Sequence, residues 1–442
     1  MADIVGSPYA VRDYVVPRET GGDAGLAALR ARLAHRGVSL ILDFVPNHTA
    51  VDHRWVRDHP EWYVHADPEA AAKEPAACFA VRIGGRSRHI AHGRDPNLPA
   101  WPDTAQLDYR VPEVRSAMAD TLRQIAIRCD GVRCDMAMLV LDDVFTGTWA
   151  EHGADPMGSR PEGEFWWHAI RDVKERFPGF TMIAEAYWDL EYRLQRLGFD
   201  YTYDKALLDR LRDGPGEAVV GHLRAESDFQ RRSVRFLENH DEPRAAAVLT
   251  SARHRSAALV VATVPGMLLL HDGQLEGARL RAPVELGRRP VEPTDDAIRT
   301  FYARLLAAVS AEPFRVGTPV RLEPRATWDG DTSHRSLTAW LWMGPHHALR
   351  LAVANVGAGT GRCFLPLPLS DLIGRTITFE DLLSDVRYER DGLDLLERGL
   401  FLELPADGHH LFRILGHALA RTDVSQRGGA NSVIASRRPS PR

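Results

Sequence analysis

The feature that most constrains the fold is a repeated alternation of short apolar runs with stretches of helical spacing, from Val38 to residue 311. Strands that alternate with helices along a chain pair in parallel. Polar residues follow nearly every apolar run, and TIM-type barrels carry their active sites at the carboxyl ends of such strands. The pattern therefore predicts an α/β fold of the TIM-barrel type. Six strands are expected, at residues 38–45, 131–135, 180–185, 199–203, 233–238 and 267–270.

A doubly wound open sheet is the alternative architecture. Sheets of that kind commonly bind nucleotides through a glycine-rich loop that directly follows a strand. No such fingerprint follows any of the six apolar runs. The barrel is therefore the favoured prediction.

The alternation is interrupted once and stops near Pro313, which predicts the domain organisation. Residues 1–48 would form a loop, a helix and the first strand of the barrel, and residues 113–312 would form its remainder. Residues 49–112 are irregular and rich in Pro, Gly, His and Trp, which indicates an inserted subdomain. Period-two runs in residues 313–416 predict an antiparallel β-sandwich. The Arg-, Ser-, Gly- and Pro-rich residues 417–442 are expected to be disordered.

Composition excludes some classes of partner. A formal net charge of -5 argues against nucleic acid or an anionic membrane as the main partner. The longest apolar stretch, residues 257–270, is broken by a Pro-Gly pair and is too short to span a bilayer, and the first six residues lack the pattern of a signal peptide. The four cysteines have neither metal-site nor disulfide-framework spacing, so we expect reduced thiols and a cytoplasmic protein. Composition does not predict the oligomeric state.

Three carboxylates stand at the ends of different predicted strands, namely Asp135, Glu185 and Asp241. Strand ends of a barrel converge on one pocket, so these side chains should meet there. Arg133 lies two residues before Asp135 and therefore on the same face of its strand. A structural ion pair at a strand end is the alternative explanation for these two residues. Asp43 ends the first strand, and we expect it to be a structural acid that holds Arg133 or the following loop.

A pocket with several carboxylates suits retaining glycoside cleavage. One carboxylate attacks the anomeric carbon, and a second, about 5–5.5 Å away, protonates the leaving oxygen and later activates water. The nucleophile needs a low pKa and the acid a raised one. Arg133 is expected to lower the pKa of Asp135, whereas the apolar neighbours of Glu185 are expected to raise the pKa of its carboxyl.

Metal-assisted hydrolysis is the other chemistry that such a pocket could support. It requires histidines at short, regular spacing on a strand or helix. None of the predicted strands carries a His-x-His pair, and His152, His168 and His271 are scattered. This chemistry is therefore disfavoured.

Taken together, these segments resemble, in the same order, the short signature regions of the α-amylase family of glycoside hydrolases (family 13). The segments that carry the resemblance are Asp-Phe-Val-Pro-Asn-His (43–48), Gly-Val-Arg-Cys-Asp (131–135), Ala-Glu-Ala-Tyr-Trp (184–188) and Phe-Leu-Glu-Asn-His-Asp (236–241), with a weaker fifth at Leu-Asp-Tyr (107–109). Each is short, but four in order at predicted strand ends are specific. The resemblance covers nearly all of residues 1–415, with residues 49–112 corresponding to the family's B domain and the sandwich to its C domain.

The resemblance implies roles for the strand-end acids. Asp135 would be the nucleophile and Glu185 the general acid/base. Asp241 would hold the sugar hydroxyls in the distorted, oxocarbenium-like state. The implied enzyme is a retaining glycosidase or transglycosidase on α-glucosidic bonds, with an α-glucan or oligosaccharide as substrate.

Four further residues would bind the substrate by the same resemblance. His48 and His240 would contact the sugar ring, Arg133 would orient the nucleophile, and Tyr9 would stack on the ring. No cofactor is implied. Calcium is a possibility because Asn47 is a calcium ligand in some relatives, although no partner set is recognisable in residues 49–112.

The chain departs from the family pattern in two places. Ala10 follows Tyr9 where many relatives carry Asp. The family's barrel also begins with a strand, a helix and a second strand before the tyrosine loop, and this chain begins at that loop, with about six of eight strands. We therefore expect that an N-terminal segment is missing and that the chain expressed alone is insoluble or inactive. The alternative is a natural short form that closes its barrel in another way. The alternative function is a non-catalytic homologue that binds sugar or a protein partner, although such proteins usually lose one of the three acids, all of which are present here.

Overall fold

The computed structural model describes residues 6–150, 163–416 and 418–419, and these form two compact units. The division falls between Leu305 and Leu306, inside helix α13 (Asp296–Val309), and residues 356–358 group with the first unit. The boundary predicted at residues 312 and 313 lies a few residues further along the chain. The predicted disordered tail lies outside the described residues except for residues 418 and 419.

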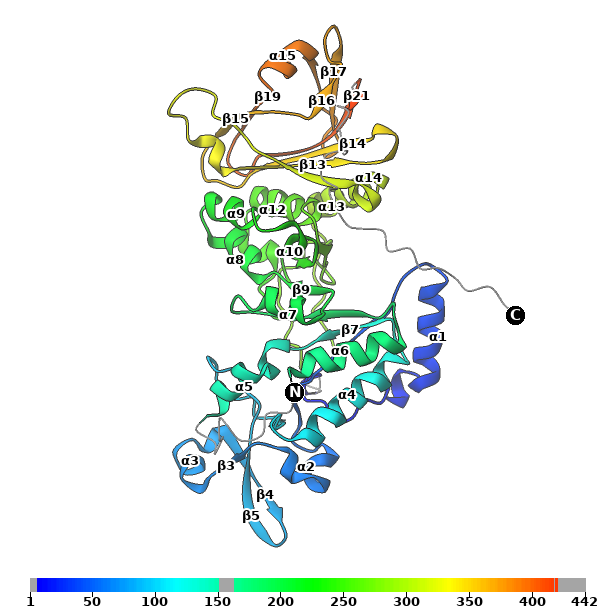
Figure 1. Cartoon of the computed structure of the whole chain (residues 1–442), viewed down its shortest axis with the longest axis vertical. Coiled ribbons are helices and arrows are strands. Elements are labelled where there is room, and N and C mark those ends of the chain that lie inside the picture. The colour runs from blue at the N-terminus through cyan, green and yellow to red at the C-terminus, as the bar shows by residue number, and fades with distance from the viewer. Residues whose placement is uncertain (1–5, 151–162, 417, 420–442) are drawn as a thin grey trace, which may run out of the picture. The chain divides into compact units, whose positions relative to one another are not determined.

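The first unit is built on a six-stranded sheet in which every neighbouring pair is parallel, as the alternation predicted (Figure 1). The strand order follows the chain order, with β1 and β11 at the two edges. The strands are β1 (Ile41–Phe44), β7 (Gly131–Cys134), β8 (Thr181–Ala184), β9 (Tyr201–Tyr203), β10 (Ser233–Arg235) and β11 (Met267–Leu268). They are shorter than the apolar runs that predicted them, because the polar strand ends lie beyond the paired residues.

The two faces of this sheet differ, as a strand period of two requires. Val132, Cys134, Met182 and Ala184 belong to a core that the helices of the outer layer cover. Ile183 belongs to a smaller apolar cluster on the opposite, inner face, together with residues of β9 and β10. Odd-numbered positions of β7 and β8 therefore face the interior.

Helices connect the strands and cover the outer face. Helices α4 and α6 lie side by side next to β7 (Figure 1), and α4 buries Met118, Leu122, Ile125 and Ala126. The main helices of this layer are α1 (Gly22–Ala34), α4 (Pro112–Ala126), α5 (Asp142–Trp149), α6 (Phe165–Arg176), α7 (Glu191–Leu197), α8 (Lys205–Asp213), α9 (Gly216–His222), α10 (Ser227–Arg231), α11 (Ala245–Val248) and α12 (Ser251–Thr263).

Helix α1 differs from the other long helices because it buries none of its residues, and Leu29 exposes 45% of its surface. It begins after Gly21, which is left-handed, and Asp23 lies in its first turn. The helix is held by Arg30, which donates through Nε and Nη2 to Asp130 Oδ1 at 3.0 and 2.8 Å.

The region predicted as irregular contains two small antiparallel sheets. One pairs β2 (His48–Ala50) with β6 (Thr104–Gln106), and the other has the order β3 (His65–Ala66), β5 (Arg86–Ala91), β4 (Cys78–Ile83). Gly84 and Gly85 both have positive φ angles, which suits the tight turn that joins β4 to β5. Helices α2 (Arg54–Asp58) and α3 (Pro68–Lys73) complete this subdomain.

The second unit is β-rich, as the period-two runs predicted. Its main antiparallel sheet has the order β12 (Thr318–Leu322), β13 (Leu337–Met343), β14 (Leu349–Asn355), β20 (His409–Leu415), β17 (Thr376–Asp381), β18 (Arg387–Asp391). Two further pairs join β15 (Gly361–Leu365) to β19 (Leu400–Leu404) and β16 (Leu369–Ser370) to β21 (Ala418–Leu419). Helices α14 (Glu312–Val316) and α15 (Gly392–Glu397) flank the strands, and a separate apolar core contains Leu351 and Phe379. Among the described residues, no helix of either unit is long and apolar enough to cross a membrane.

Candidate active site

The interior face of the sheet carries the predicted carboxylates at its carboxyl edge. Asp135 and Glu185 each continue their strand's hydrogen bonding by one residue, because Asp135 N donates to Phe44 O at 2.9 Å and Glu185 N donates to Cys134 O at 3.0 Å. Both have odd numbers and therefore share the interior face with Arg133. The backbone thus fixes both carboxylates at adjacent strand ends.

Arg133 is the centre of this cluster. Its Nη1 donates to Asp43 Oδ1 at 3.1 Å and to Asp135 Oδ1 at 2.9 Å, and its Nη2 forms an ion pair with Glu185 Oε2 at 2.7 Å. The predicted pair with Asp135 and the predicted role of Asp43 as a holder of Arg133 are both observed. The contact with Glu185 was not predicted, since sequence spacing relates residues within one strand and not across two.

The pKa predicted for Asp135 was wrong in direction. Burial, together with the charge of Glu185, raises the pKa of Asp135 to about 8, although Arg133 acts to lower it. One guanidinium faces three carboxylates, so it cannot neutralise all of them in a site that excludes water. Asp135 therefore keeps its proton to a higher pH than an exposed Asp carboxyl does.

Glu185 is held on both oxygens. Tyr187 Oη donates to Oε1 at 2.7 Å and Met136 N donates to Oε2 at 2.8 Å. The Met136 amide reaches Glu185 because Met136 is left-handed, with φ of 42°, a conformation that costs a residue with a side chain about 1–2 kcal/mol. Tyr187 was not predicted as a site residue, although its position two residues after Glu185 placed it on the same face.

The remaining predicted residues join the same network. Tyr9 Oη forms a hydrogen bond with His240 Nε2 at 2.8 Å, and the two rings stack with centroids 5.3 Å apart. His48 Nε2 contacts Tyr9 O at 3.2 Å, and His240 Nε2 lies 3.0 Å from Asp241 Oδ2. The guanidinium carbon of Arg133 lies 5.3 Å from the centroid of the Tyr9 ring. The structure therefore brings all seven predicted site residues together.

The histidines and the third acid also have shifted pKa values. Burial lowers the pKa of His48 to about 4 and lowers the pKa of His240 as well. Both rings are therefore neutral at pH 7 and can donate or accept hydrogen bonds without charge. Burial raises the pKa of Asp241, whose side chain is still 45% exposed.

The residues around Asn47 do not favour a calcium site. Gln106 Nε2 donates to Asn47 Oδ1 at 3.0 Å, and Asn47 Nδ2 donates to Gln106 Oε1 at 3.1 Å, so the two amides pair with each other. Within residues 6–150, 163–416 and 418–419, no group of three or more His, Cys, Asp or Glu side chains is placed to hold a metal ion. No step below depends on a metal.

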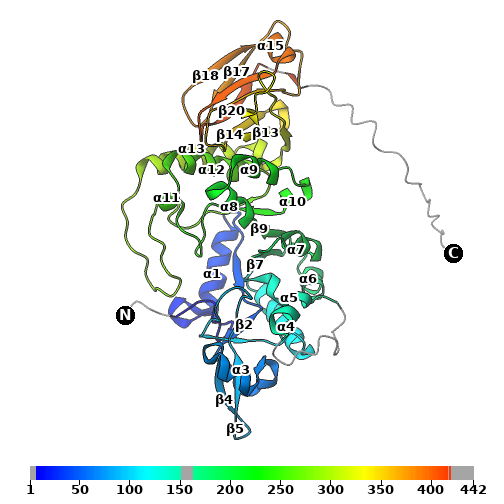
Figure 2. The ribbon, with the colours of Figure 1, turned by 90° about the vertical axis from the view of Figure 1, so that its left-hand side faces the viewer.

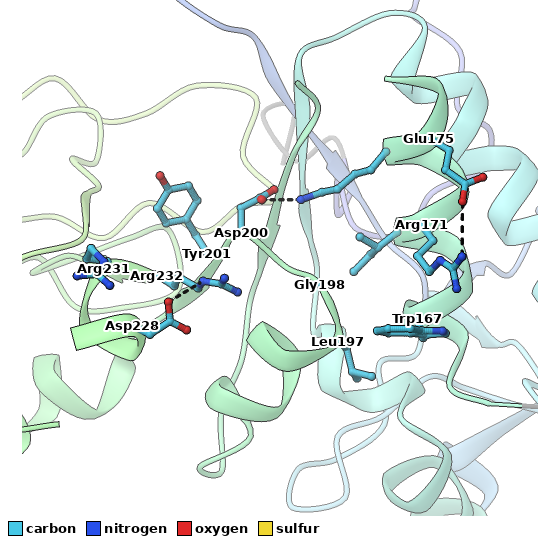
Figure 3. A pocket seen from close by; sticks show the side chains of 12 residues that line it. Trp167, Arg171, Glu175, Leu197, Gly198, Asp200, Tyr201, Asp228, Arg231 and Arg232 are labelled. Atoms are coloured by element: carbon cyan, nitrogen blue, oxygen red, sulfur yellow. Dashed lines mark hydrogen bonds and ion pairs between the residues drawn. The ribbon is translucent and has the colours of Figure 1, made fainter. Parts of the chain in front are cut away.

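A cavity of about 740 Å³ lies elsewhere, between α6 and α10 and near the amino ends of β9 and β10 (Figure 3). Its charged groups pair with one another: Lys174 with Asp200, Arg171 with Glu175, and Arg232 with Asp228. The cavity is on the opposite end of the strands from Asp135 and contains none of the predicted site residues. It is therefore not the candidate active site.

Comparisons with known proteins agree with the site. The family model described as alpha amylase, catalytic domain, matches residues 3–211. Alpha-amylase MalA of Haloarcula japonica is 28% identical over 321 residues, which are 69% of this chain and 41% of that protein. Trehalose-6-phosphate hydrolase of Escherichia coli is 28% identical over 150 residues, 31% of this chain and 27% of that protein. The chain thus spans less than half the length of either relative.

Solved structures show the same fold. A maltogenic alpha-amylase, AmyB from Thermotoga neapolitana, superposes with a TM-score of 0.66 at 20% identity, covering 93% of this chain and 86% of that one. The alpha-amylase of Geobacillus thermoleovorans complexed with acarbose gives a TM-score of 0.62 at 18% identity, covering 92% and 84%. These likenesses imply a (β/α)8-type barrel with a C-terminal β domain.

Proposed function

The chain belongs, through residues 3–211, to the α-amylase family of glycoside hydrolases, and from this premise we propose that it cleaves or transfers α-glucosidic bonds with retention of configuration. The proposed substrate is an α-glucan or an oligosaccharide derived from one. The observation that carries the proposal is that Asp135 and Glu185, from adjacent strand ends, bind the two terminal nitrogens of the single guanidinium of Arg133.

The proposed first step forms a glycosyl-enzyme. A carboxylate oxygen of Asp135 attacks the anomeric carbon while the glycosidic C–O bond breaks, and Glu185 gives its proton to the leaving oxygen. The products are an aspartyl ester of the sugar and the free leaving group. The step requires an ionised Asp135 and a proton on Glu185.

The proposed second step returns the enzyme to its starting state. Glu185, now a carboxylate, takes a proton from water or from a sugar hydroxyl, whose oxygen attacks the anomeric carbon and releases Asp135. Water as acceptor gives hydrolysis, and a sugar as acceptor gives transfer. Every proton and bond in the two steps is accounted for by the carboxyl groups of the chain and by the substrates.

The other residues of the network would bind the ring. The neutral imidazoles of His48 and His240 can hydrogen-bond sugar hydroxyls, and the Tyr9 ring can pack against the sugar. Asp241 pairs with His240 and its side chain is 45% exposed, so its oxygens remain available to accept hydroxyl donors. These are the features of a site that distorts and holds one glucose unit.

The decisive experiment replaces Asp135 by Asn. We expect kcat for maltooligosaccharide cleavage to fall at least about 10³-fold, because the nucleophile of a covalent mechanism is lost. Asp213→Asn, which changes an exposed carboxylate paired with Arg212, is the matched control and should retain activity. Starch, maltose, trehalose and sucrose are assayed in parallel, and NMR of the first product shows which anomer forms.

Unchanged activity in the Asp135→Asn variant, or a β-anomer as the first product, would refute the retaining mechanism. A wild-type chain that binds these sugars without converting any of them would support the non-catalytic alternative instead.

A further inference from the structure

The loop that carries Asp241 is closed at its base by a buried ion pair. Glu238 precedes the loop and is 1% exposed. Its Oε1 accepts from Arg244 Nη1 at 2.7 Å, and its Oε2 accepts from the backbone N of Ala245, also at 2.7 Å. The two ends of residues 238–245 are therefore joined, and His240 and Asp241 lie between them.

Arg244 extends this closure to a second loop. Its guanidinium donates to the backbone oxygens of Asp272 at 2.8 Å and Leu280 at 3.4 Å, and lies 2.9 Å from His271 Nδ1. These residues belong to the long connection between β11 and α13, which Figure 2 shows as an extended loop. Arg281 follows directly, and its charge acts on Asp241. Arg244 thus ties residues 238–245 to the loop that carries Arg281.

The backbone of Asp241 is fixed from within the loop as well. Asn239 Oδ1 accepts from the backbone N of both Asp241 and Glu242 at 2.9 Å. The side chain of Asp241, in contrast, is 45% exposed, and the contact it makes within the described part of the chain is with His240. Packing around the carboxylate therefore does not fix its orientation, which depends on how residues 238–245 are held.

We propose that Glu238 and Arg244 form a positioning pair, which aims Asp241 at the sugar by closing the base of its loop and tying it to residues 271–281. The inference rests on the proposed function, since it assigns the pair a role in that reaction. Neither residue touches the substrate; both act through Asp241. A positioning error of about 1 Å in such a group can cost roughly 100-fold in rate.

The test is a double-mutant cycle with Glu238→Gln and Asp241→Asn, measured as kcat/KM on α-maltosyl fluoride by fluoride release. Glu238→Gln keeps the shape of the side chain and removes the charge that Arg244 binds. We expect a loss of about 10-fold or more in the wild-type background and less than about 2-fold in the Asp241→Asn background, because the pair acts through Asp241. Glu380→Gln, which removes a carboxylate bound by Arg387 and Arg413 in the second unit, is the matched control.

Equal losses in the two backgrounds, or no loss at all, would overturn the positioning role. Thermal unfolding of each variant is measured in parallel to check that it folds. If Glu238→Gln does not fold, Arg244→Lys replaces it, because lysine keeps the positive charge but lacks the planar guanidinium with its several donors. With Arg244→Lys as well, equal losses in the two backgrounds or no loss would overturn the positioning role. An inactive wild-type chain would count against the proposed function, whereas an active wild type with an additive cycle counts only against the positioning pair.

Discussion

At the scale of single residues, the site concentrates unfavourable charge. Asp43, Asp135 and Glu185 share one guanidinium, so the cluster carries a net charge of -2 when all three carboxyls are ionised. Burial makes that state costly. Such a cluster detracts from stability, and in the proposed reaction it would serve the chemistry, which is the trade-off expected of a catalytic site.

This trade-off predicts how stability depends on pH. The ordinary pKa of an Asp carboxyl is 3.8, and in the folded chain that of Asp135 is raised to about 8. Between these values the folded chain holds a proton that the unfolded chain has released, so stability falls as pH rises through this window. Asp135→Asn removes that dependence. The gain in melting temperature of the variant over wild type should therefore be larger at pH 8 than at pH 5, by about 1 °C or more.

Differential scanning fluorimetry at pH 5 and pH 8 measures the gain in melting temperature of Asp135→Asn over wild type. The control variant is Asp213→Asn, which alters a far more exposed carboxyl. It should change the melting temperature by the same small amount at pH 5 and at pH 8. A gain for Asp135→Asn that is larger at pH 5 would mean that Arg133 holds Asp135 ionised, as the sequence alone had suggested.

At the scale of elements, β7 depends on the absence of a side chain at its first residue. A Cβ on Gly131 would lie 2.5 Å from Thr181 O on β8 and 2.6 Å from Ile41 Cδ1 on β1. Real Cβ atoms do not approach so closely, so both neighbouring strands would have to move. The strand that carries Arg133 and precedes Asp135 would be displaced with them.

Gly131→Ala should therefore destabilise the first unit by about 1–3 kcal/mol, the usual cost of overpacking. Gly147→Ala is the matched control, because a Cβ there meets nothing within 4 Å in the exposed part of α5, and alanine favours the helix by up to about 1 kcal/mol. Urea midpoints of both variants provide the measurement. Equal midpoints for Gly131→Ala and wild type would show that β1 and β8 accommodate the methyl group.

Helices and strands were predictable from the sequence where a local pattern of apolar residues determines them. The apolar runs before Asp135, Glu185 and Asp241 predicted parallel strands with neighbouring acids; the strands are parallel, and Asp135 and Glu185 share Arg133. Contacts between strands have no local signal, so neither the ion pair of Arg133 with Glu185 nor the crowding at Gly131 was foreseen. Gly131 opens β7 at a point where both neighbouring strands approach it closely.

The charge state of the site escaped prediction for the same reason. One Arg next to one Asp lowers the pKa of the acid, and sequence spacing shows no more than that. Folding buries Asp135 and adds a second buried carboxylate to the same guanidinium, and together these raise the pKa of Asp135 instead of lowering it. The two small sheets in residues 48–106 were missed because their strands are short and their pairing is set by tertiary contacts.

At the scale of the whole molecule, the described residues form two units, each with an apolar core of its own. Phe379 lies in the core of the second unit, is 0% exposed, and packs edge-on against Phe412 with ring centroids 5.7 Å apart. Separate cores imply that a cavity in one need not loosen the other. The catalytic residues proposed above all lie in the first unit.

Phe379→Ala should therefore destabilise the second unit by about 3–5 kcal/mol and leave the first unit nearly unchanged. Hydrogen exchange followed by mass spectrometry reports on the stability of each unit separately. Peptides from β14 and β20 should lose protection from exchange, while peptides from β7 and β8 should keep it. Phe401→Ala is the matched control, because Phe401 is 41% exposed and its loss leaves no buried cavity. If protection instead falls equally in β7 and β14, the two cores unfold as one cooperative unit, and a mutation in the β-rich part would then have to be counted among those that act on the active site.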